Sequence, residues 1–479
     1  EHRGAIGQFT SAPSGADAVG CHWPVSLEIP VAPEWRSGFH LVTMTAHGVE
    51  DGRDTGHACF VVGRNPAPQP NPAPNRMLVI LATNTWNAYN IWGGRSLYTG
   101  GSQVSFERPF SRGTLSRPEV ERDDRKARPV RFGEEADVDG EIFQAYRFAN
   151  GYPSAIGSTG WFTHERRFVE WAERAGHAMD YAISADLESA GTLEGYELVV
   201  SVGHDEYWTG AARDAIDNHI AGGGNFVSMS GNTMFWQVRL IERAGTGETR
   251  EGHMVCHKYG AVTGDPVMAA GEAASAEMSG LWCDPIVGRP EWTTLGAGSV
   301  FGLYHRFGRA TARGVGGFSV YRPDHWMLAG TDLGYGDVLG ADHGVVGYET
   351  VGCPLTFDEF QLPVLRRDAR FEDFPDELEI VGFALSSNLG VGEYPSSIAA
   401  LNDQGDLEFL AERFYGDTGA DNLARVRHGN AVMLTCRPFG PTGGEVVTIG
   451  TTDWVFGLAD DPRVGRVTSN VLDRFLTVG

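Results

Sequence analysis

The chain has 479 residues, of which 42% are hydrophobic and 21% are charged, and its formal net charge is −24. This length and composition are those of a globular protein and exclude a disordered or fibrous chain. The acidic balance argues against a nucleic-acid partner, because phosphate backbones are bound by clustered lysine and arginine. No apolar run approaches the roughly 20 residues needed to cross a bilayer, so we expect a soluble protein without a membrane partner.

The six cysteines lie far apart in the sequence and form no CxxC pair. Such spacing favours reduced thiols, which are typical of a reducing compartment. We therefore expect a cytoplasmic protein. Because the chain begins at Glu1 rather than at a methionine, a removed leader segment stays open as an alternative.

The N-terminal part of the chain carries the pattern of short β-strands. Residues 17–62 contain alternating apolar runs, among them 26–30, separated by glycine, proline and acidic turns. We predict a small β-sandwich-like module over residues 1–64. Residues 65–75 read NPAPQPNPAPN and form a semi-rigid spacer, because proline fixes φ and prevents both helix and central strand. This spacer marks a domain boundary.

Buried strands alternate with helices in the rest of the chain. Four continuous apolar runs are typical of strands buried on both faces of a parallel sheet, and they lie at residues 77–82, 197–202, 225–230 and 446–450. Thr209 is a suitable N-cap for a helix that ends at three glycines, 222–224. A last helix contains Val467 and Phe475.

The repeated order of strand, helix and strand predicts an α/β fold with a doubly wound parallel sheet and right-handed crossovers. We assign this domain to residues 76–244 and 430–479. Between them, residues 245–429 are rich in glycine, aromatic residues and short strands. We predict that they form a long β-rich insertion that covers the functional site.

The segments that follow the predicted strands are unusually polar. In open α/β sheets, ligands bind outside the carboxyl ends of the strands. Loops from four strands can therefore bring donors, acceptors and aromatic walls to one edge, as a small-molecule site requires. The candidate pocket residues are Asn84, Trp86, Tyr89, Trp236, Asp453 and Trp454.

The segment from His204 to Tyr207 places an imidazole, two carboxylates and a phenol directly after the second buried strand. Imidazole and carboxylate transfer protons, and a phenolate can bind a hard trivalent metal. The alternative is a hydrogen-bonded turn whose acidic residues favour a helix N-terminus. We single out His204 and Glu206 as catalytic candidates, and Tyr207 as a phenol that could either donate a hydrogen bond or bind a metal.

Four further residues complete the candidate set. Asn232 follows the third strand and could hold a developing oxyanion. Glu349 could be a ligand or a base, or an ordinary salt-bridged carboxylate. His253 and His257 are four residues apart and would share a face of either a helix or a strand, so they are candidate metal ligands. Ordinary histidines on a partly buried strand are the alternative. No glycine-rich nucleotide-binding loop follows a strand.

Five segments together resemble the N,N-dimethylformamidase large (beta) subunit family. The resemblance extends from about residue 24 to the end of the chain. It implies a domain similar to class I glutamine amidotransferases, joined to an N-terminal immunoglobulin-like β module. The segments are TNTWNAYNIWGG (83–94), VSFERP (104–109), VGHDEYW (202–208), SGNTMFW (230–236) and TTDWV (451–455).

The resemblance also implies a metal site. In the family's amidase, a mononuclear iron held by two tyrosines and a glutamate activates water against a small amide. Tyr207 matches a ligand tyrosine, Asn232 a position in the same crevice, and Glu349 a carboxylate near the site. His164 and Glu165 stand where the second tyrosine is expected. A small companion subunit is implied as a partner, and a homo-oligomer is the alternative.

These residues lead to one main hypothesis, which is metal-assisted hydrolysis of a carbon–nitrogen amide bond in a small uncharged substrate, with iron as the expected metal. The first alternative is a non-catalytic module that captures a sugar or amine between Trp86, Trp236 and Trp454. The second is a non-haem iron oxidoreductase, which would consume oxygen.

Overall fold

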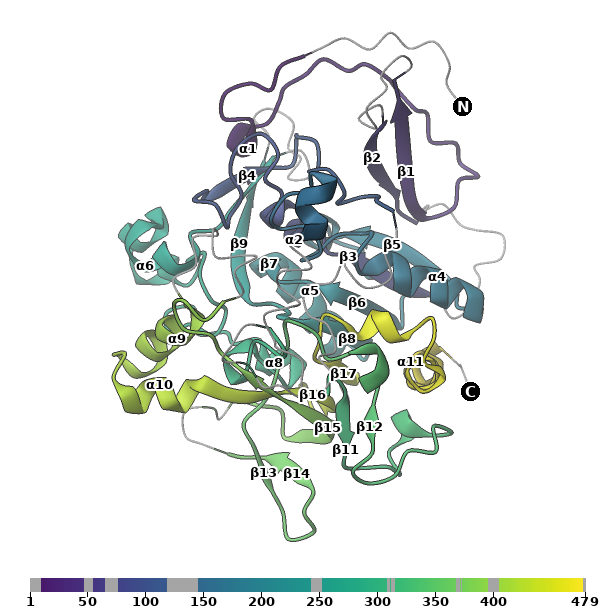
Figure 1. The fold of residues 1–479 in the computed structure, drawn as a ribbon, viewed down its shortest axis with the longest axis vertical. Coiled ribbons are helices and arrows are strands. Elements are labelled where there is room, and N and C mark those ends of the chain that lie inside the picture. The colour runs from purple at the N-terminus through teal and green to yellow at the C-terminus, as the bar shows by residue number, and fades with distance from the viewer. Residues whose placement is uncertain are drawn as a thin grey trace.

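A computed structural model shows an α/β body with a strand pair at each end (Figure 1). The predicted spacer at 65–75 lies outside the residues that the structure describes. Those are residues 10–46, 55–64, 76–118, 145–242, 252–307, 311, 315–367, 371, 373–394 and 405–476.

The core of the fold is a nine-stranded sheet in the order β12-β11-β15-β16-β17-β8-β6-β3-β5. Its last five strands are parallel to one another. Numbered along the chain, these five lie in the order 2-1-3-4-5, and this order reverses between β3 and β6, where ligands bind in doubly wound sheets. The likeness to class I glutamine amidotransferases stays a prediction. The five strands are β5 (Met179–Ile183), β3 (Met77–Leu81), β6 (Leu198–His204), β8 (Asn225–Gly231) and β17 (Val446–Ile449).

Helices cover both faces of this sheet. Successive side chains along a strand point to opposite faces, so each strand contributes to one core on either side of the sheet. Leu78 and Ile80 of β3 pack in the same core as α5 (Gly210–Ala221). Met77 and Val79 pack in a second core with α4 (Glu165–Ala175) and α11 (Pro462–Leu476). Burial on both faces explains why these strands read as continuous apolar runs.

The predicted insertion differs from its expected role. It supplies β11 (Phe318–Val320), β12 (Val338–Leu339) and β15 (Glu377–Ser387), which extend the central sheet in antiparallel fashion beyond β16 (His428–Arg437). The segment 245–429 therefore builds part of the sheet rather than only covering it. A register shift between Ile380 and Gly382 breaks the two-residue alternation by which a strand is recognised.

A second sheet, which the sequence did not predict, lies beside the first. It has four strands in the order β4-β10-β9-β7, and β7 begins at Tyr207, only three residues after β6 ends at His204. The segment from His204 to Tyr207 therefore joins the two sheets. The strands are β4 (Gln103–Ser105), β10 (His253–Val255), β9 (Trp236–Ile241) and β7 (Tyr207–Thr209).

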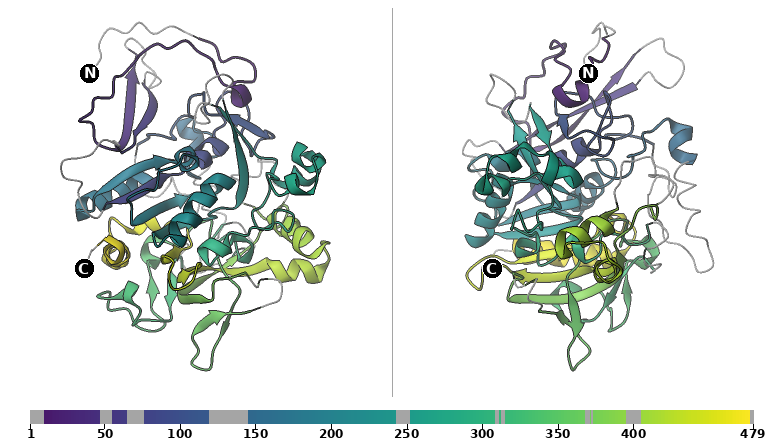
Figure 2. Two further views of the ribbon diagram at one scale, coloured as in Figure 1. Left: turned by 180° about the vertical axis from the view of Figure 1, so that it is seen from behind. Right: turned by 90° about the vertical axis from the view of Figure 1, so that its left-hand side faces the viewer.

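The N-terminal part contains an antiparallel pair, β1 (Gly38–Thr45) and β2 (Thr55–Val62), and a short helix, α1 (Ala16–Val19). Residues 26–30, expected as a strand, have no regular structure. The pair lies at one end of the molecule, opposite the strand pair β13 (Leu355–Phe357) and β14 (Pro363–Leu365) (Figures 1 and 2). The immunoglobulin-like character of this module stays a prediction.

The remaining helices are short. Within the described ranges, none combines the length and the apolar composition that crossing a bilayer demands. They include α2 (Thr83–Tyr89), α6 (Ala261–Gly264), α7 (Glu272–Ser275), α8 (Trp292–Leu295), α9 (Asp406–Tyr415) and α10 (Ala420–Arg427).

The predicted N-cap of α5 is confirmed. The Thr209 hydroxyl accepts a hydrogen bond of 3.1 Å from the backbone N–H of Ala212. The helix ends at Ala221, directly before the three glycines. This cap fixes the start of the helix that follows β7 directly in the chain.

We expect the substitution Thr209→Ala to destabilise the fold by about 1 kcal/mol, because it leaves the N–H of Ala212 without its acceptor. The midpoint of chemical denaturation measures the effect. Thr209→Ser keeps the acceptor oxygen and is the matched control. Equal destabilisation by the two substitutions would contradict a capping role.

Candidate functional site

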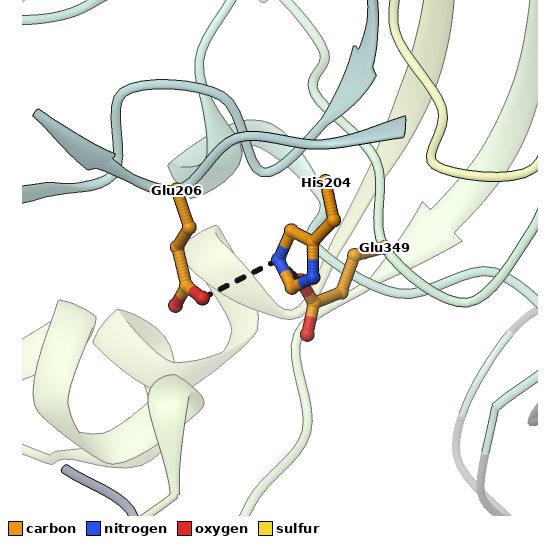
Figure 3. Close-up of side chains that lie close together, drawn as sticks. All are labelled: His204, Glu206 and Glu349. Carbon is orange, nitrogen blue, oxygen red and sulfur yellow. Dashed lines mark ion pairs between the residues drawn. The ribbon is translucent and has the colours of Figure 1, made fainter. Parts of the chain in front are cut away.

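Three buried ionisable side chains converge at the carboxyl end of β6 (Figure 3). His204 is the last residue of that strand, Glu206 follows two residues later, and Glu349 comes from the segment between β12 and β13. The Nε2 atom of His204 lies 2.6 Å from Oε2 of Glu349 and 3.3 Å from Oε2 of Glu206. The three residues are 0%, 2% and 5% exposed, so their charges interact with little screening by water.

The backbone before His204 is shaped to place it there. Gly203 has a φ of +80°, and a Cβ at this position would collide with the side chain of His164. Glycine meets both conditions because it has no Cβ.

The two ring nitrogens of His204 face different groups. Nδ1 lies 2.8 Å from the carbonyl oxygen of Ser158 and 3.0 Å from the hydroxyl of Tyr348. Burial by itself lowers the pKa of His204, but the charges of Glu349 and Glu206 outweigh it and raise the pKa to about 10. Without a further cation, the ring is therefore an imidazolium held between the backbone and two carboxylates.

Glu206 is the acceptor for two aromatic donors. The Tyr98 hydroxyl lies 2.7 and 2.8 Å from its two oxygens, and Nε1 of Trp236 donates at 2.8 Å. The hydroxyl of Tyr207 in turn donates to that of Tyr98 at 2.9 Å. Burial alone would raise the pKa of Glu206, but His204, Lys258 and Tyr98 lower it below its ordinary value. Glu206 is thus a buried carboxylate kept ionised by its neighbours.

Asn232 connects the end of β8 to this group. Its Nδ2 atom donates to Oε2 of Glu349 at 3.2 Å, and its Oδ1 atom accepts from the Ser299 hydroxyl at 2.7 Å. Its φ is +51°, in the left-handed region where asparagine is tolerated better than most residues. The structure therefore brings together all four predicted catalytic residues, which are His204, Glu206, Asn232 and Glu349.

Comparison with known proteins bears directly on this geometry. A family model described as "N,N-dimethylformamidase beta subunit-like, C-terminal" matches residues 7–467, which is nearly the whole chain. The chain belongs to this family. The predicted family resemblance is thereby confirmed, and every residue of the group lies within the matched range.

One curated relative is the N,N-dimethylformamidase beta subunit of Alcaligenes sp, to which the chain is 32% identical over 74 residues. The aligned stretch covers 15% of this chain and 10% of the relative. The chain thus aligns with only about a tenth of that dimethylformamidase subunit.

Three of the predicted pocket residues lie against the group. Tyr89 packs on Tyr98 with ring centroids 4.1 Å apart and lies 5.5 Å from the His204 ring. Trp236 is a donor to Glu206. Asn84 donates to the backbone oxygen of Tyr207 at 3.2 Å.

Asp453 lies at the border of the site. It accepts a hydrogen bond from the Thr452 hydroxyl, and its charge is among those that raise the pKa of Tyr348, after burial and two glutamates. A Cβ on Gly347 would overlap its carboxylate. Asp453 therefore packs directly against the backbone of Gly347, which precedes Tyr348 and Glu349 in the chain.

Trp86, Trp236 and Trp454, which the alternative hypothesis of a binding module places around one ligand, lie in two different cores. Trp86 and Trp454 belong to the core on the α4 and α11 face, whereas Trp236 belongs to the core on the α5 face. Trp86 donates to Glu165 and Trp454 to Thr468, so both are anchored away from the group. A position at a strand end does not determine which face of the sheet receives the side chain.

His253 and His257 do not belong to the buried group. Along β10 and the residues after it, Met254 and Cys256 are buried, whereas His253, Val255 and His257 are half-buried. The strand alternation therefore turns both histidines to its more open side. Their role as metal ligands has no support from this geometry.

Sequence reasoning missed two residues of the site, Tyr98 and Lys258. Tyr98 lies in a turn without strand or helix pattern, so no periodicity points to it. Lys258 directly follows His257 but has its ammonium 3.2 Å from the centre of the Tyr98 ring. The one feature of the sequence that could have pointed to Lys258 was the rarity of lysine in this chain.

We expect Glu349→Gln to lower the pKa of His204 in the metal-free protein, because Glu349 makes the largest contribution that raises it. In the wild type, this ion pair stabilises the fold fully below about pH 6.5 and progressively less as the pH rises through about 10. Titration of the histidine rings by NMR measures the shift.

The matched control is Glu379→Gln, which removes a more exposed carboxylate 3.7 Å from His325. It should leave the His204 titration unchanged. An unaltered pKa of His204 in Glu349→Gln would show that Glu349 does not hold the imidazolium.

Proposed function

We propose that this chain is the catalytic subunit of a metal-dependent amidohydrolase that cleaves the carbon–nitrogen bond of a small neutral amide of the formamide type. The observation that carries the proposal is the buried contact between His204 and Glu349, directly beside a carboxylate with two linked phenols. Membership of the N,N-dimethylformamidase beta subunit-like family supports the reaction class. The enclosure of the group supports a small substrate.

The residues present fit a metal ion. The donors are carboxylate and phenol oxygens and one imidazole nitrogen, a set suited to iron and similar metals. Nε2 of His204 is buried and close to Glu349 without the alignment of a hydrogen bond. Charged atoms gathered in this way are compatible with an ion between them.

Two ligand sets are available, and Glu206 belongs to both. The first is His204, Glu206 and Glu349, whose ligand atoms lie within 4.8 Å of one another. The second is Glu206 with Tyr98 and Tyr207, linked by hydroxyl contacts of 2.7 to 2.9 Å. We favour the second set, because it matches the two tyrosines and one glutamate that the family resemblance implies. It also leaves His204 and Glu349 for proton transfer.

When bound, the metal would polarise the amide carbonyl and lower the pKa of its water ligand. A metal cation beside His204 would disfavour the charged form of the ring. Nε2 of the neutral ring can then accept the proton that the attacking water loses and deliver it to the leaving amine nitrogen as the carbon–nitrogen bond breaks. Glu349 stabilises the imidazolium in between. Asn232 orients Glu349 through Nδ2 and can donate to the developing oxyanion.

The central test is metal analysis of the purified protein, followed by turnover of N,N-dimethylformamide and related small amides. We expect stoichiometric iron and release of equal amounts of amine and carboxylic acid. Glu206→Gln should abolish both metal content and turnover. Oxygen uptake coupled to amide consumption would instead favour the oxidoreductase, and a metal-free protein without turnover would favour a binding role.

His204→Asn distinguishes the two ligand sets. If His204 transfers protons and is not a ligand, the substitution should lower kcat by about 10² to 10⁴-fold and leave the metal content unchanged. Elemental analysis and steady-state kinetics on the same preparation measure both quantities. Loss of the metal together with activity would assign His204 to the ligand set.

Three single phenylalanine substitutions, at Tyr89, Tyr98 and Tyr207, identify the phenol ligands. A phenolate bound to ferric iron absorbs visible light, so loss of a ligand removes part of this absorption. We expect losses in Tyr98→Phe and Tyr207→Phe. The Tyr89→Phe protein shows whether the phenol that packs on Tyr98 contributes to the absorption as well.

The assembly is also part of the proposal. The relative is named a beta subunit, and we propose that this chain likewise associates with a small companion subunit. Light scattering of the chain alone and after co-expression with a candidate small subunit measures this. A homo-oligomer of the chain alone with full activity would contradict the need for a companion.

A further inference from the structure

Lys258 is a buried cation at the edge of the site. The chain contains 38 lysine and arginine residues, of which only Lys126 and Lys258 are lysines. Lys126 lies outside the described residues. Lys258 is 6% exposed, and lysine is among the residue types that are least often fully buried. The burial of one of the two lysines in the chain therefore needs a structural explanation.

The surroundings of Lys258 supply such a reason. Its ammonium lies 3.2 Å from the centre of the Tyr98 ring and 5.1 Å from that of Trp236. The rings of Tyr259 and Tyr207 follow at 5.7 and 6.0 Å. A cation over an aromatic face is attracted by the ring quadrupole, and the attraction grows when water is excluded.

The same two nearest rings are the donors to Glu206. Tyr98 donates through its hydroxyl and Trp236 through Nε1, while Lys258 lies over their faces. The cation therefore fixes both rings in the orientation that directs their polar edges at the carboxylate. Its charge also lies near a buried anion, which reduces the cost of keeping Glu206 ionised in a dry environment.

The backbone is held so that the side chain reaches this position. Lys258 has a φ of +53°, a left-handed conformation that is unusual for a lysine. Its N–H and that of His257 both donate to the backbone oxygen of Ser279. On the other side, the Tyr259 hydroxyl donates to the buried Asp406 at 2.7 Å. Such strain persists where neighbouring contacts enforce it, and it is often found at functional sites.

Lysine differs from arginine in a way that matters here. Its ammonium is a compact point charge, whereas guanidinium is broad and planar. The chain uses arginine at all of its other basic positions except Lys126. At 3.2 Å from the ring centre, a compact charge is placed directly on the Tyr98 face.

We propose that Lys258 is a positioning residue of the catalytic site, whose ammonium fixes Tyr98 and counterbalances the negative charge gathered on Glu206 and on the Tyr98 oxygen. This inference rests on the proposed function, in which Tyr98 and Glu206 hold the metal. The ammonium lies closest to the ring, so its charge stabilises electrons on the phenol oxygen more than electrons on the metal.

The test uses the full chain loaded with ferric iron. Lys258→Met keeps the length and apolar stem of the side chain but removes the charge. Because the filled phenolate orbital then rises in energy, we expect the visible phenolate-to-iron band to move to longer wavelength. Lys258→Arg retains the charge but spreads it over a planar group, so it should move the band less than Lys258→Met does. A purely structural role would give equal shifts in the two variants.

The matched control is Arg425→Met. Arg425 is an exposed cation 5.2 Å from the centre of the Tyr415 ring, so the substitution removes a surface cation–π contact. It should not move the band. An unmoved band in Lys258→Met would overturn the inference and leave the proposed function intact.

A wild-type protein that shows no such band contradicts the phenol ligand set and overturns the part of the inference that concerns the Tyr98 oxygen; turnover then tests whether Lys258 counterbalances Glu206. Lys258→Met should then lower kcat at unchanged KM, while Arg425→Met changes neither. Equal kinetics of Lys258→Met and wild type would overturn the inference. The absence of both band and turnover would overturn it together with the proposed function.

Discussion

The site depends on one buried ionic contact, in which His204 lies between Glu349 and Glu206. Charges removed from water are costly unless they are paired and hydrogen-bonded. Almost every other feature of the site meets this requirement. Asn232 donates to Glu349, and Tyr98 and Trp236 donate to Glu206. On the other side of the imidazole, Nδ1 of His204 lies within hydrogen-bond distance of the carbonyl oxygen of Ser158. These hydrogen bonds therefore allow three ionisable groups to lie next to one another away from water.

The topology explains why these groups meet. The strand order reverses between β3 and β6, and in doubly wound sheets ligands bind at the carboxyl ends of the strands at such a point. His204 ends β6, and α2 begins directly after β3 with the residues that approach Tyr207. Glu349 reaches the same edge from a segment far along the chain. A general property of parallel sheets therefore places the chemistry, and the loops supply its details.

Much of the fold and part of the site could be predicted from the sequence. The buried strands read as apolar runs because both of their faces are covered. Thr209 was recognised because threonine is a favoured residue at a helix N-cap. His204, Glu206 and Asn232 were singled out because they lie at the ends of predicted strands, and Glu349 because the family resemblance implies a carboxylate near the site. Tyr98 and the side of the sheet taken by Trp86 and Trp454 were not, because a turn has no periodicity and a strand end has no fixed face. The antiparallel extension was obscured by a bulge in β15.

Trp236 holds Glu206 at two points, through its backbone N–H to the carbonyl of Glu206 at 3.0 Å and through its indole N–H to the carboxylate at 2.8 Å. The carboxylate therefore has little freedom to rotate or to be displaced. A protein built in this way cannot adapt to larger substrates by shifting its central motif. Diversification of substrate range on this scaffold would have to come from the surrounding segments that carry Tyr98 and Tyr259, while the sheet-borne residues stay as they are.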